Sequence, residues 1–471
     1  MLVDMGVFGK STRGGAAVPT TGRDLSGRIA LARFELLIFC GLVSLALALR
    51  LPAFFDPIAH MDDQFYRLVG TQLLEGADLY VDIWDRKPPG MFYLAALISA
   101  IHPEPRFYYL AATLFAAGTA QVIVLICRHC TGWQGSFLAG CAYLVTLQTV
   151  AGGFGQSSVF YNLFTVLGVL LILKQRFYIA MFALGTSLAF KQTAIFECIA
   201  LGLYCASRVD WRRIPLLAAS GLIPFVLVCL PLVGHLPEAW HAMVLSSLDR
   251  DLPNGPSILG RSLDLFRRLI PLIAGATLGL VFHRQRISAV WLAAALLGVV
   301  SVPQLYLHYA IPLLPPLCVA CAPFLDRRFI GLAGFAAIVG YALVFFSPLN
   351  FGIHKARAAE FNRIAEVIRQ QPGDDLLVYE GPTQLYAATG RRNLSPLVFP
   401  THLNAAAEID VSHLHTSEEM RSILSRRPSV VVTTATPLTD PENTQTRELL
   451  RAYLADCTRL EEGLEVWRCT P

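Results

Sequence analysis

The chain has 471 residues, of which 54% are hydrophobic and only 15% are charged, and its formal net charge is +4. Soluble domains usually carry about 25% charged residues, and the mean hydropathy here is +0.52. This composition excludes a purely soluble protein and predicts an α-helical polytopic membrane protein. The small net charge gives no reason to expect a nucleic-acid partner.

Residues 1–32 are rich in Gly, Ser and Thr and carry several basic side chains, which predicts a short disordered cytoplasmic tail. A cleaved signal peptide is not expected. Ala46-Leu47-Ala48 has the form of a cleavage site, but it lies inside the apolar run, and the polar stretch ahead of it is long. We therefore expect a retained first span with its centre at residues 36–49.

Eleven segments are apolar enough to be considered as membrane spans, although several are shorter than the roughly 20 residues that a spanning helix needs. They cover residues 33–51, 107–127, 135–151, 158–173, 177–190, 193–207, 213–234, 265–282, 288–303, 305–325 and 328–347. These segments predict a transmembrane domain over residues 33–347. Two large loops interrupt it, at residues 52–106 and 235–264.

One further apolar stretch, residues 91–101, determines the topology. If this stretch is a half-helix that only dips into the outer leaflet, five basic connections between spans fall on the cytoplasmic side, as the positive-inside rule requires. These connections contain Arg128-His129, Lys174/Arg176, Arg208/Arg212/Arg213, His283/Arg284/Arg286 and Arg327/Arg328. If it crosses the membrane, they all move outside. We therefore expect a half-helix and an extracytoplasmic position for both large loops. Arg267 and Arg268, near an outer helix end, are an exception to the rule.

Residues 348–471 alternate between helix-like and strand-like segments. The helical segments are 356–370, 382–389 and 444–454, and the strand-like segments are 375–379 and 429–433. This alternation predicts a small soluble α/β domain, which the topology places outside the cytoplasm. Cys457 and Cys469 could form a disulfide there, although sequence alone does not show whether they are close.

The polar first loop carries the residues best suited to chemistry. Asp62 and Asp63 are adjacent and point in different directions, so one could be a general base for a hydroxyl group while the other has a supporting role. Capping of the following helix is the simpler alternative. Lys87 lies before two prolines and is suited to bind a phosphate or to act as an interfacial anchor. Asp85 nearby makes the cluster mixed in sign, which is unusual for an anchor.

Lys191, His308 and Tyr309 lie near the outer ends of their predicted helices, level with the first loop. They could contact the same anion, because ionisable groups in hydrophobic regions are often functional. Anchoring of Lys191 and a structural role for His308 are the alternatives. His241 could share a divalent cation with the two aspartates, but the spacing matches no short metal motif. The metal question stays open.

Four stretches resemble the GT-C glycosyltransferases that use polyprenyl-phosphate sugars. They are Asp62-Asp63 followed by Phe65-Tyr66, the run from Leu79 to Gly90, Phe190 to Thr193, and His308 to Pro316. The group includes the protein O-mannosyltransferases, the aminoarabinose transferases of lipid A and the galacturonosyl transferases of lipopolysaccharide core. The resemblance covers nearly the whole chain and implies a GT-C fold of about eleven transmembrane helices with a periplasmic C-terminal domain.

The resemblance also implies an activity and roles for single residues. Such enzymes move a sugar from a polyprenyl-phosphate carrier, with inversion, to an acceptor on the outer face of the membrane. Asp62 would be the catalytic base and Asp63 a supporting carboxylate, while Lys87 would bind the carrier phosphate, helped by Lys191 or His308. Arg86 departs from the pattern, because some relatives have an acidic residue there that could hold a metal.

These inferences define the expected partners, location and alternatives. The donor is a polyprenyl-phosphate sugar, and the acceptor is lipopolysaccharide, another glycolipid, a polysaccharide or a protein of the envelope. The expected location is the inner membrane of a bacterium. A transporter or flippase of envelope glycolipids is the main alternative, although no internal repeat is visible and the polar residues cluster on one face. A non-catalytic scaffold is the third.

Overall fold

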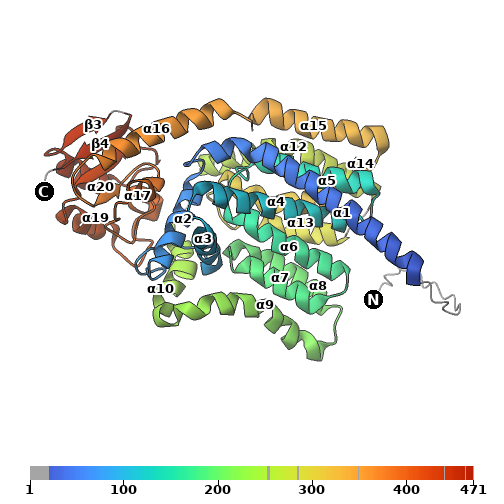
Figure 1. Ribbon diagram of the computed structural model, residues 1–471. Coiled ribbons are helices and arrows are strands. Elements are labelled where there is room, and N and C mark those ends of the chain that lie inside the picture. Colours follow the sequence, from blue (N-terminus) through green and yellow to red (C-terminus); the bar gives the residue numbers. More distant parts are fainter. Residues whose placement is uncertain are drawn as a thin grey trace.

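The computed structural model describes residues 21–251, 255–283, 286–347, 349–439, 441–461 and 463–469. Residues 1–20 of the expected tail lie outside this range. The described chain forms a bundle of helices that run side by side, followed by a smaller domain at one end of the bundle (Figure 1).

Each predicted span is matched by one helix of the bundle. These helices are α1 (Thr21–Arg50), α4 (Pro105–Cys127), α5 (Trp133–Thr149), α6 (Ser157–Leu173), α7 (Phe177–Leu188), α8 (Ile195–Ala206), α9 (Ile214–Cys229), α12 (Gly255–Phe282), α13 (Arg286–Val300), α14 (Leu314–Leu325) and α15 (Arg328–Phe346). Six helical segments of the described chain are long and apolar enough to cross a membrane, and the others are shorter. Two helices start earlier than predicted: α1 begins before residue 33 and α12 before residue 265.

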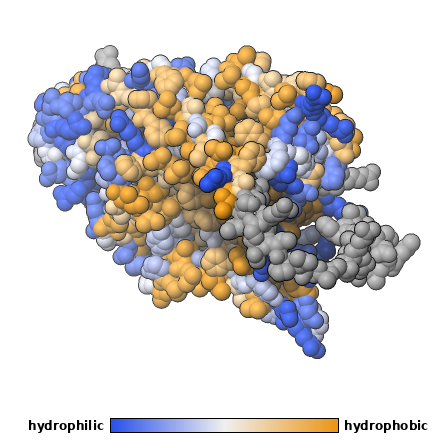
Figure 2. All heavy atoms as spheres, turned by 45° about the vertical axis from the view of Figure 1, so that its right-hand side comes forward, coloured by the Kyte–Doolittle hydropathy of each residue, from blue (hydrophilic) through white to orange (hydrophobic). Residues whose placement is uncertain are grey.

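The surface of the bundle is hydrophobic, as the predicted fold class requires. A belt of apolar side chains lies between two hydrophilic ends (Figure 2). Large exposed apolar residues on the bundle helices include Leu37, Leu114, Ile179, Leu203, Leu216, Leu227, Val281, Leu297, Phe329 and Val344. A soluble monomer rarely exposes such a large apolar surface, so this belt is the part of the molecule that lipid covers.

The first loop contains two helices that lie beside the C-terminal domain (Figure 1). These are α2 (Met61–Leu74) and α3 (Pro89–Ile101), and a 3-10 turn, η1 (Leu51–Phe55), precedes them. The 13 residues of α3 are about 20 Å long, at 1.5 Å per residue, and a bilayer core is about 30 Å thick. Helix α3 is therefore shorter than a bilayer core, as several bundle helices are, and it packs along α2.

Short helical turns make up most of the second loop. They are η4 (Leu230–His235), α10 (Leu236–Trp240), the π-helical turn η5 (His241–Leu245) and α11 (Ser246–Asp249). The loop is shorter than predicted, because α12 already begins at Gly255.

The connections that carry the basic clusters lie at the end of the bundle away from the C-terminal domain (Figure 1). At this end Asp326, which follows α14, accepts hydrogen bonds from the backbone N–H groups of Gly132 (2.8 Å) and Gly135 (2.9 Å). The carboxylate thereby satisfies N–H groups at the start of α5 that would otherwise lack partners. This contact ties two distant helices together at that end.

The C-terminal domain follows helix α16 (Phe351–Arg369) and contains a four-stranded sheet in the order β1-β2-β4-β3. Strands β1 (Leu376–Val378) and β2 (Val430–Thr434) are parallel, whereas β4 (Leu464–Arg468) pairs antiparallel with β2 and with β3 (Thr458–Glu461). The helices are α17 (Gln384–Thr389), α18 (Thr401–Asn404), η7 (Ala406–Glu408), α19 (Thr416–Ser425) and α20 (Thr444–Leu454). The α/β class is as predicted, and Cys457 and Cys469, for which sequence left pairing open, form a disulfide.

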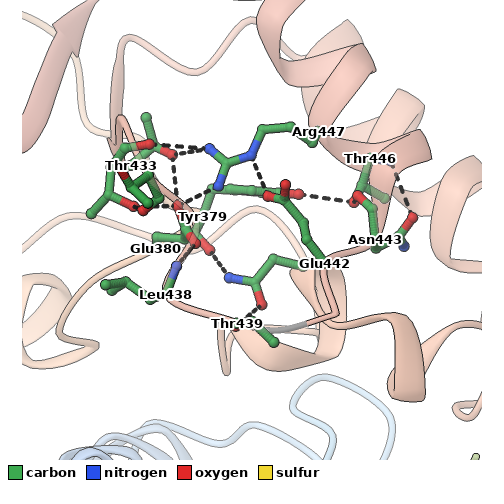
Figure 3. A network of polar contacts seen from close by, with 12 residues as sticks. Tyr379, Glu380, Thr433, Leu438, Thr439, Glu442, Asn443, Thr446 and Arg447 are labelled. Atoms are coloured by element: carbon green, nitrogen blue, oxygen red, sulfur yellow. Dashed lines mark hydrogen bonds and ion pairs between the residues drawn. The ribbon is translucent and has the colours of Figure 1, made fainter.

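A buried ion-pair network holds this domain together (Figure 3). Arg447 of α20 pairs with Glu380 (2.5 Å) and with Glu442, and it also donates to the Thr433 hydroxyl (2.9 Å). Glu380 accepts a further hydrogen bond from the backbone of Leu438 (2.8 Å). Removal of one member would leave a buried charge without its partner, which is strongly destabilising.

Candidate active site

Asp62 lies in the first turn of α2, where His60 caps the helix. The His60 Nδ1 atom accepts from the backbone N–H of Asp62 (3.2 Å) and lies 2.7 Å from the Gln156 amide nitrogen. The Asp62 side chain is 14% exposed, and its Oδ2 atom lies 3.9 Å from His308 Nε2. Burial opposes ionisation, but nearby Lys87, His308 and His60 together hold the Asp62 pKa below its usual value. Asp62 is thus an ionised carboxylate with partial access to solvent.

Asp63 has a different environment, although it is the next residue. Its side chain is buried, and Oδ2 accepts a hydrogen bond from the backbone N–H of Gly155 (2.7 Å). Burial raises the Asp63 pKa to about 6, although His60 and this hydrogen bond act in the opposite direction. A Cβ atom at Gly155 would collide with the ring of Tyr108, so only glycine allows this close approach. These contacts connect Asp63 to the protein interior.

Lys87 lies at the other end of the first loop, next to Asp85. The Lys87 Nζ atom is 3.2 Å from the Asp85 carboxylate, and the Lys87 backbone N–H donates to the same group (2.9 Å). Tyr80 donates a hydrogen bond to the Lys87 carbonyl (2.7 Å). Burial favours the neutral amine, but Asp85 and Asp62 outweigh it and raise the Lys87 pKa. Lys87 is therefore a fixed, charged ammonium group that acts electrostatically on Asp62.

Gly90 brings the first loop against the connection between α7 and α8. The Gly90 N–H donates to the Ala189 carbonyl (3.0 Å), and a Cβ atom at Gly90 would lie 2.5 Å from that oxygen. Gln192 donates from the other side to the carbonyl groups of Arg86 and Met243. The segments that carry the two predicted lysines, 87 and 191, are thereby joined by backbone contacts.

Lys191 and Tyr309 are in contact next to the connection between α7 and α8. The Lys191 Nζ atom lies 4.3 Å from the centre of the Tyr309 ring, whose own neighbour is His308 at 4.5 Å between ring centres. Burial lowers the pKa of Lys191 to about 7, and repulsion from Lys87 adds to this effect. A small pocket opens here. It is lined by Tyr161, Lys191, Thr193, Glu197, Ala295, Gly298, Val302, Tyr309 and Pro312.

The described contacts do not bring His241 to the two aspartates. Its Nδ1 atom is buried without a hydrogen-bond partner in the described residues, and it acts electrostatically on His413 of the C-terminal domain. The His/Asp cluster that could hold a cation is instead His60, Asp62 and His308, whose donor atoms lie within 4.8 Å of one another.

Sequence reasoning missed His60, Gln156 and Glu408. His60 immediately precedes the two aspartates, so its place next to a helix start was a usable signal for a capping residue. Gln156 and Glu408 gave no such signal, because each comes from a distant part of the chain and belongs to no recognisable motif.

No family model matches this chain, and no curated protein matches its sequence. Solved structures do match its fold. ArnT from Cupriavidus metallidurans bound to undecaprenyl phosphate has a TM-score of 0.63 at 13% identity, over 93% of this chain and 98% of that one. The apo form of ArnT gives 0.58 at 12% identity, over 94% and 98%. The apo oligosaccharyltransferase of Archaeoglobus fulgidus gives 0.52 at 11% identity, over 85% and 69%.

These neighbours share the GT-C fold, so the predicted fold class is confirmed over almost the full chain. At 11–13% identity the likeness concerns the fold. The activity has to be argued from the side chains that the fold brings together.

Proposed function

We propose that this chain is an inverting glycosyltransferase that uses a polyprenyl-phosphate sugar as its donor. The observation that carries the proposal is a cluster of basic groups around the Asp62 carboxylate. His308 lies 3.9 Å from it, and the ammonium groups of Lys87, fixed by Asp85, and of Lys191 act on it electrostatically. The undecaprenyl phosphate bound to ArnT supports a carrier of the same chemistry for this chain. Acceptors at the envelope fit an outward-facing site.

In the proposed reaction, the Asp62 carboxylate takes the proton of an acceptor hydroxyl. The hydroxyl oxygen forms a bond to the anomeric carbon on the face opposite the carrier, and the bond from that carbon to the phosphate oxygen breaks. The phosphate leaves with the bonding electron pair. Lys87, with Lys191 and Tyr309 nearby, stabilises the growing negative charge of the leaving group, and Asp62 then releases its proton to water.

Three observations support a periplasmic position for the site and the C-terminal domain in a bacterial inner membrane. The basic connections lie at the opposite end of the bundle, as the positive-inside rule requires for a cytoplasmic face. Helices α2 and α3 of the first loop lie beside the C-terminal domain at one end of the bundle (Figure 1), and Arg86 of this loop bonds to Glu408 of the domain. The disulfide between Cys457 and Cys469 is typical of oxidising compartments.

The test is mass spectrometry of envelope glycolipids and glycoproteins from a strain that lacks the gene and carries a plasmid copy. The wild-type copy should restore a sugar that is missing in the deletion strain, and Asp62→Asn should not restore it. The matched control is Asp82→Asn, which removes a carboxylate at an exposed position of the same loop. If the Asp62→Asn copy restored the missing sugar, Asp62 would not be the catalytic base. If the deletion strain lacked no sugar, the protein would not be a glycosyltransferase of the envelope.

A flippase is distinguished by an assay that needs no membrane. Loss of a flippase for the sugar donor would also leave the acceptor one sugar lighter in the cell, so the envelope comparison alone does not separate the two activities. Transfer of a sugar to an acceptor by the purified protein in detergent identifies a transferase.

A further inference from the structure

A segment of the C-terminal domain, residues 393–408, lies along the first loop. The Trp84 backbone N–H donates to the carbonyl group of Pro396 (3.0 Å), and the Trp84 ring packs at 4.7 Å against the ring of His402. Both Trp84 and His402 are buried. The domain is therefore connected to the bundle not only through α16 but also through specific contacts with the residues that precede Lys87.

The last residue of this segment, Glu408, binds two arginines from two different loops. Arg86 of the first loop makes two hydrogen bonds with its carboxylate, and Arg250 of the second loop lies 2.9 Å from it. The Glu408 side chain is only 3% exposed. Burial opposes its charge, but the two guanidinium groups outweigh burial and lower the Glu408 pKa. An ionised carboxylate thus joins three separate parts of the chain.

Arg86 is the residue through which this contact reaches the site. It stands between Asp85 and Lys87, and its backbone carbonyl accepts a hydrogen bond from Gln192. The side chain of Arg86 is held by the C-terminal domain while its backbone is held by the bundle. Little freedom remains for the next residue, whose ammonium group is in turn fixed by Asp85.

We propose that Glu408 is a positioning residue of the transferase, which acts through Arg86 to hold Lys87 where the carrier phosphate binds. The C-terminal domain then completes the active site. This inference rests on the proposed function for the role of Lys87, whereas the mechanical link itself can be tested without any turnover.

The experiment compares Glu408→Gln with Glu461→Gln in the full-length protein in detergent. Glu461 is a matched control, because its carboxylate pairs with Arg363 in the same domain, away from the first loop. Hydrogen–deuterium exchange followed by mass spectrometry should show faster exchange over residues 82–90 in Glu408→Gln, by about tenfold or more. The rate of sugar transfer should fall by at least tenfold. Neither should change in Glu461→Gln.

A second variant, Arg86→Gln, removes the same link from the loop side, where the packing of the domain is not affected. Arg86→Gln should reproduce the faster exchange over residues 82–90. The double variant Arg86→Gln/Glu408→Gln should exchange in this segment no faster than either single variant, because both changes remove the same contact. Normal exchange over residues 82–90 in Arg86→Gln would overturn the inference, and so would a uniform increase over the whole domain in Glu408→Gln.

Failure of the proposed function has a different signature. In that case the exchange results stand as expected, but Asp62→Asn leaves the envelope unchanged.

Discussion

At the scale of single residues, the two adjacent aspartates show how position changes chemistry. Asp62 faces the cations of the site and is ionised, whereas Asp63 turns to the backbone of Gly155 and is buried. The residues alone left open which of the two is the general base, and the resemblance implied Asp62 as the base with Asp63 as a supporting carboxylate. The contacts favour Asp62 as the base and Asp63 as a support for the 150–156 connection.

Asp63→Asn should make the stability of the protein less dependent on pH. The folded-state pKa of about 6 lies above the unfolded value of about 4, so wild-type stability falls as the pH rises through this interval. The loss amounts to about 3 kcal/mol for a shift of this size. Thermal unfolding in detergent from pH 4 to 7 measures it. If the stability of Asp63→Asn fell as steeply with pH as that of the wild type, the raised pKa of Asp63 would be wrong.

Lys87→Ala should weaken the binding of undecaprenyl phosphate and reduce sugar transfer by about 100-fold or more, because a buried phosphate would lose a charge-assisted contact. Lys87→Arg should recover only part of the loss, since the guanidinium group has another shape and a longer reach. Affinity measurements with undecaprenyl phosphate check the first effect. Lys355→Ala serves as a control, because this lysine lies on α16 outside the site. Equal affinity in Lys87→Ala would exclude a phosphate contact.

A chelator should leave activity unchanged. The His60 Nδ1 atom already accepts hydrogen bonds near a helix end, and two lysines act electrostatically on each other and on Asp62, so a divalent cation would meet repulsion there. The measurement is sugar transfer with and without EDTA, with metal analysis of the purified protein. One equivalent of bound zinc, or loss of activity that added metal restores, would contradict this expectation.

At the scale of elements, the site depends on close approaches between helices and connections. Gly90 lets the start of α3 touch the end of α7, and this contact places two lysines in one region. A short half-helix with glycine at its start was predictable from Pro88-Pro89-Gly90. The partner of that glycine was not predictable, because sequence periodicity does not say which helices become neighbours.

Gly90→Ala should destabilise the protein by about 1–3 kcal/mol, the usual cost of overpacking, and should weaken the binding of undecaprenyl phosphate. The added methyl group would meet the Ala189 carbonyl oxygen, a backbone atom that cannot rotate away. Gly41→Ala in α1 is the control, because nothing lies within 4 Å of a Cβ atom there. Thermal unfolding of both variants measures the loss of stability. Equal melting temperatures would show that the first loop can shift away from Ala189 and accommodate the methyl group.

Elements were predicted best where a single signal governs them. Apolar length located every bundle helix, and β1 and β2 followed from runs of apolar residues, whereas α20 was predicted as a helical segment of the soluble domain. Strands β3 and β4 were missed, because both contain charged residues and neither is a continuous apolar run. They are stabilised mainly by pairing within the sheet, in which β4 lies between β2 and the edge strand β3. The start of α12 was missed because its first turns are polar.

At the scale of the whole molecule, the bundle and the C-terminal domain form one working unit. The domain contacts the first loop through residues 393–408. Helix α16 contacts an earlier part of the same loop through His354, which lies 2.8 Å from the buried carboxylate of Asp56. None of these contacts could be inferred from sequence, since they join positions about 300 residues apart.

The orientation of this unit can be tested by labelling single cysteines in a chain without other reactive cysteines. Position 448, exposed on α20, should react with a membrane-impermeant maleimide in intact spheroplasts. Position 210, exposed between α8 and α9, should react only after the membrane is opened. The reverse pattern would invert the topology and would place Asp62 in the cytoplasm.

The order in which the ribosome makes this chain gives the Arg86–Glu408 contact one more consequence. The aspartate of the site emerges early and Glu408 emerges more than 300 residues later, after every bundle helix has been synthesised. A nascent or truncated polypeptide would therefore hold the proposed base without the anchor for the loop of Lys87, the proposed phosphate-binding residue. Such a fragment would be inert toward the lipid-linked sugar pool until biogenesis is complete.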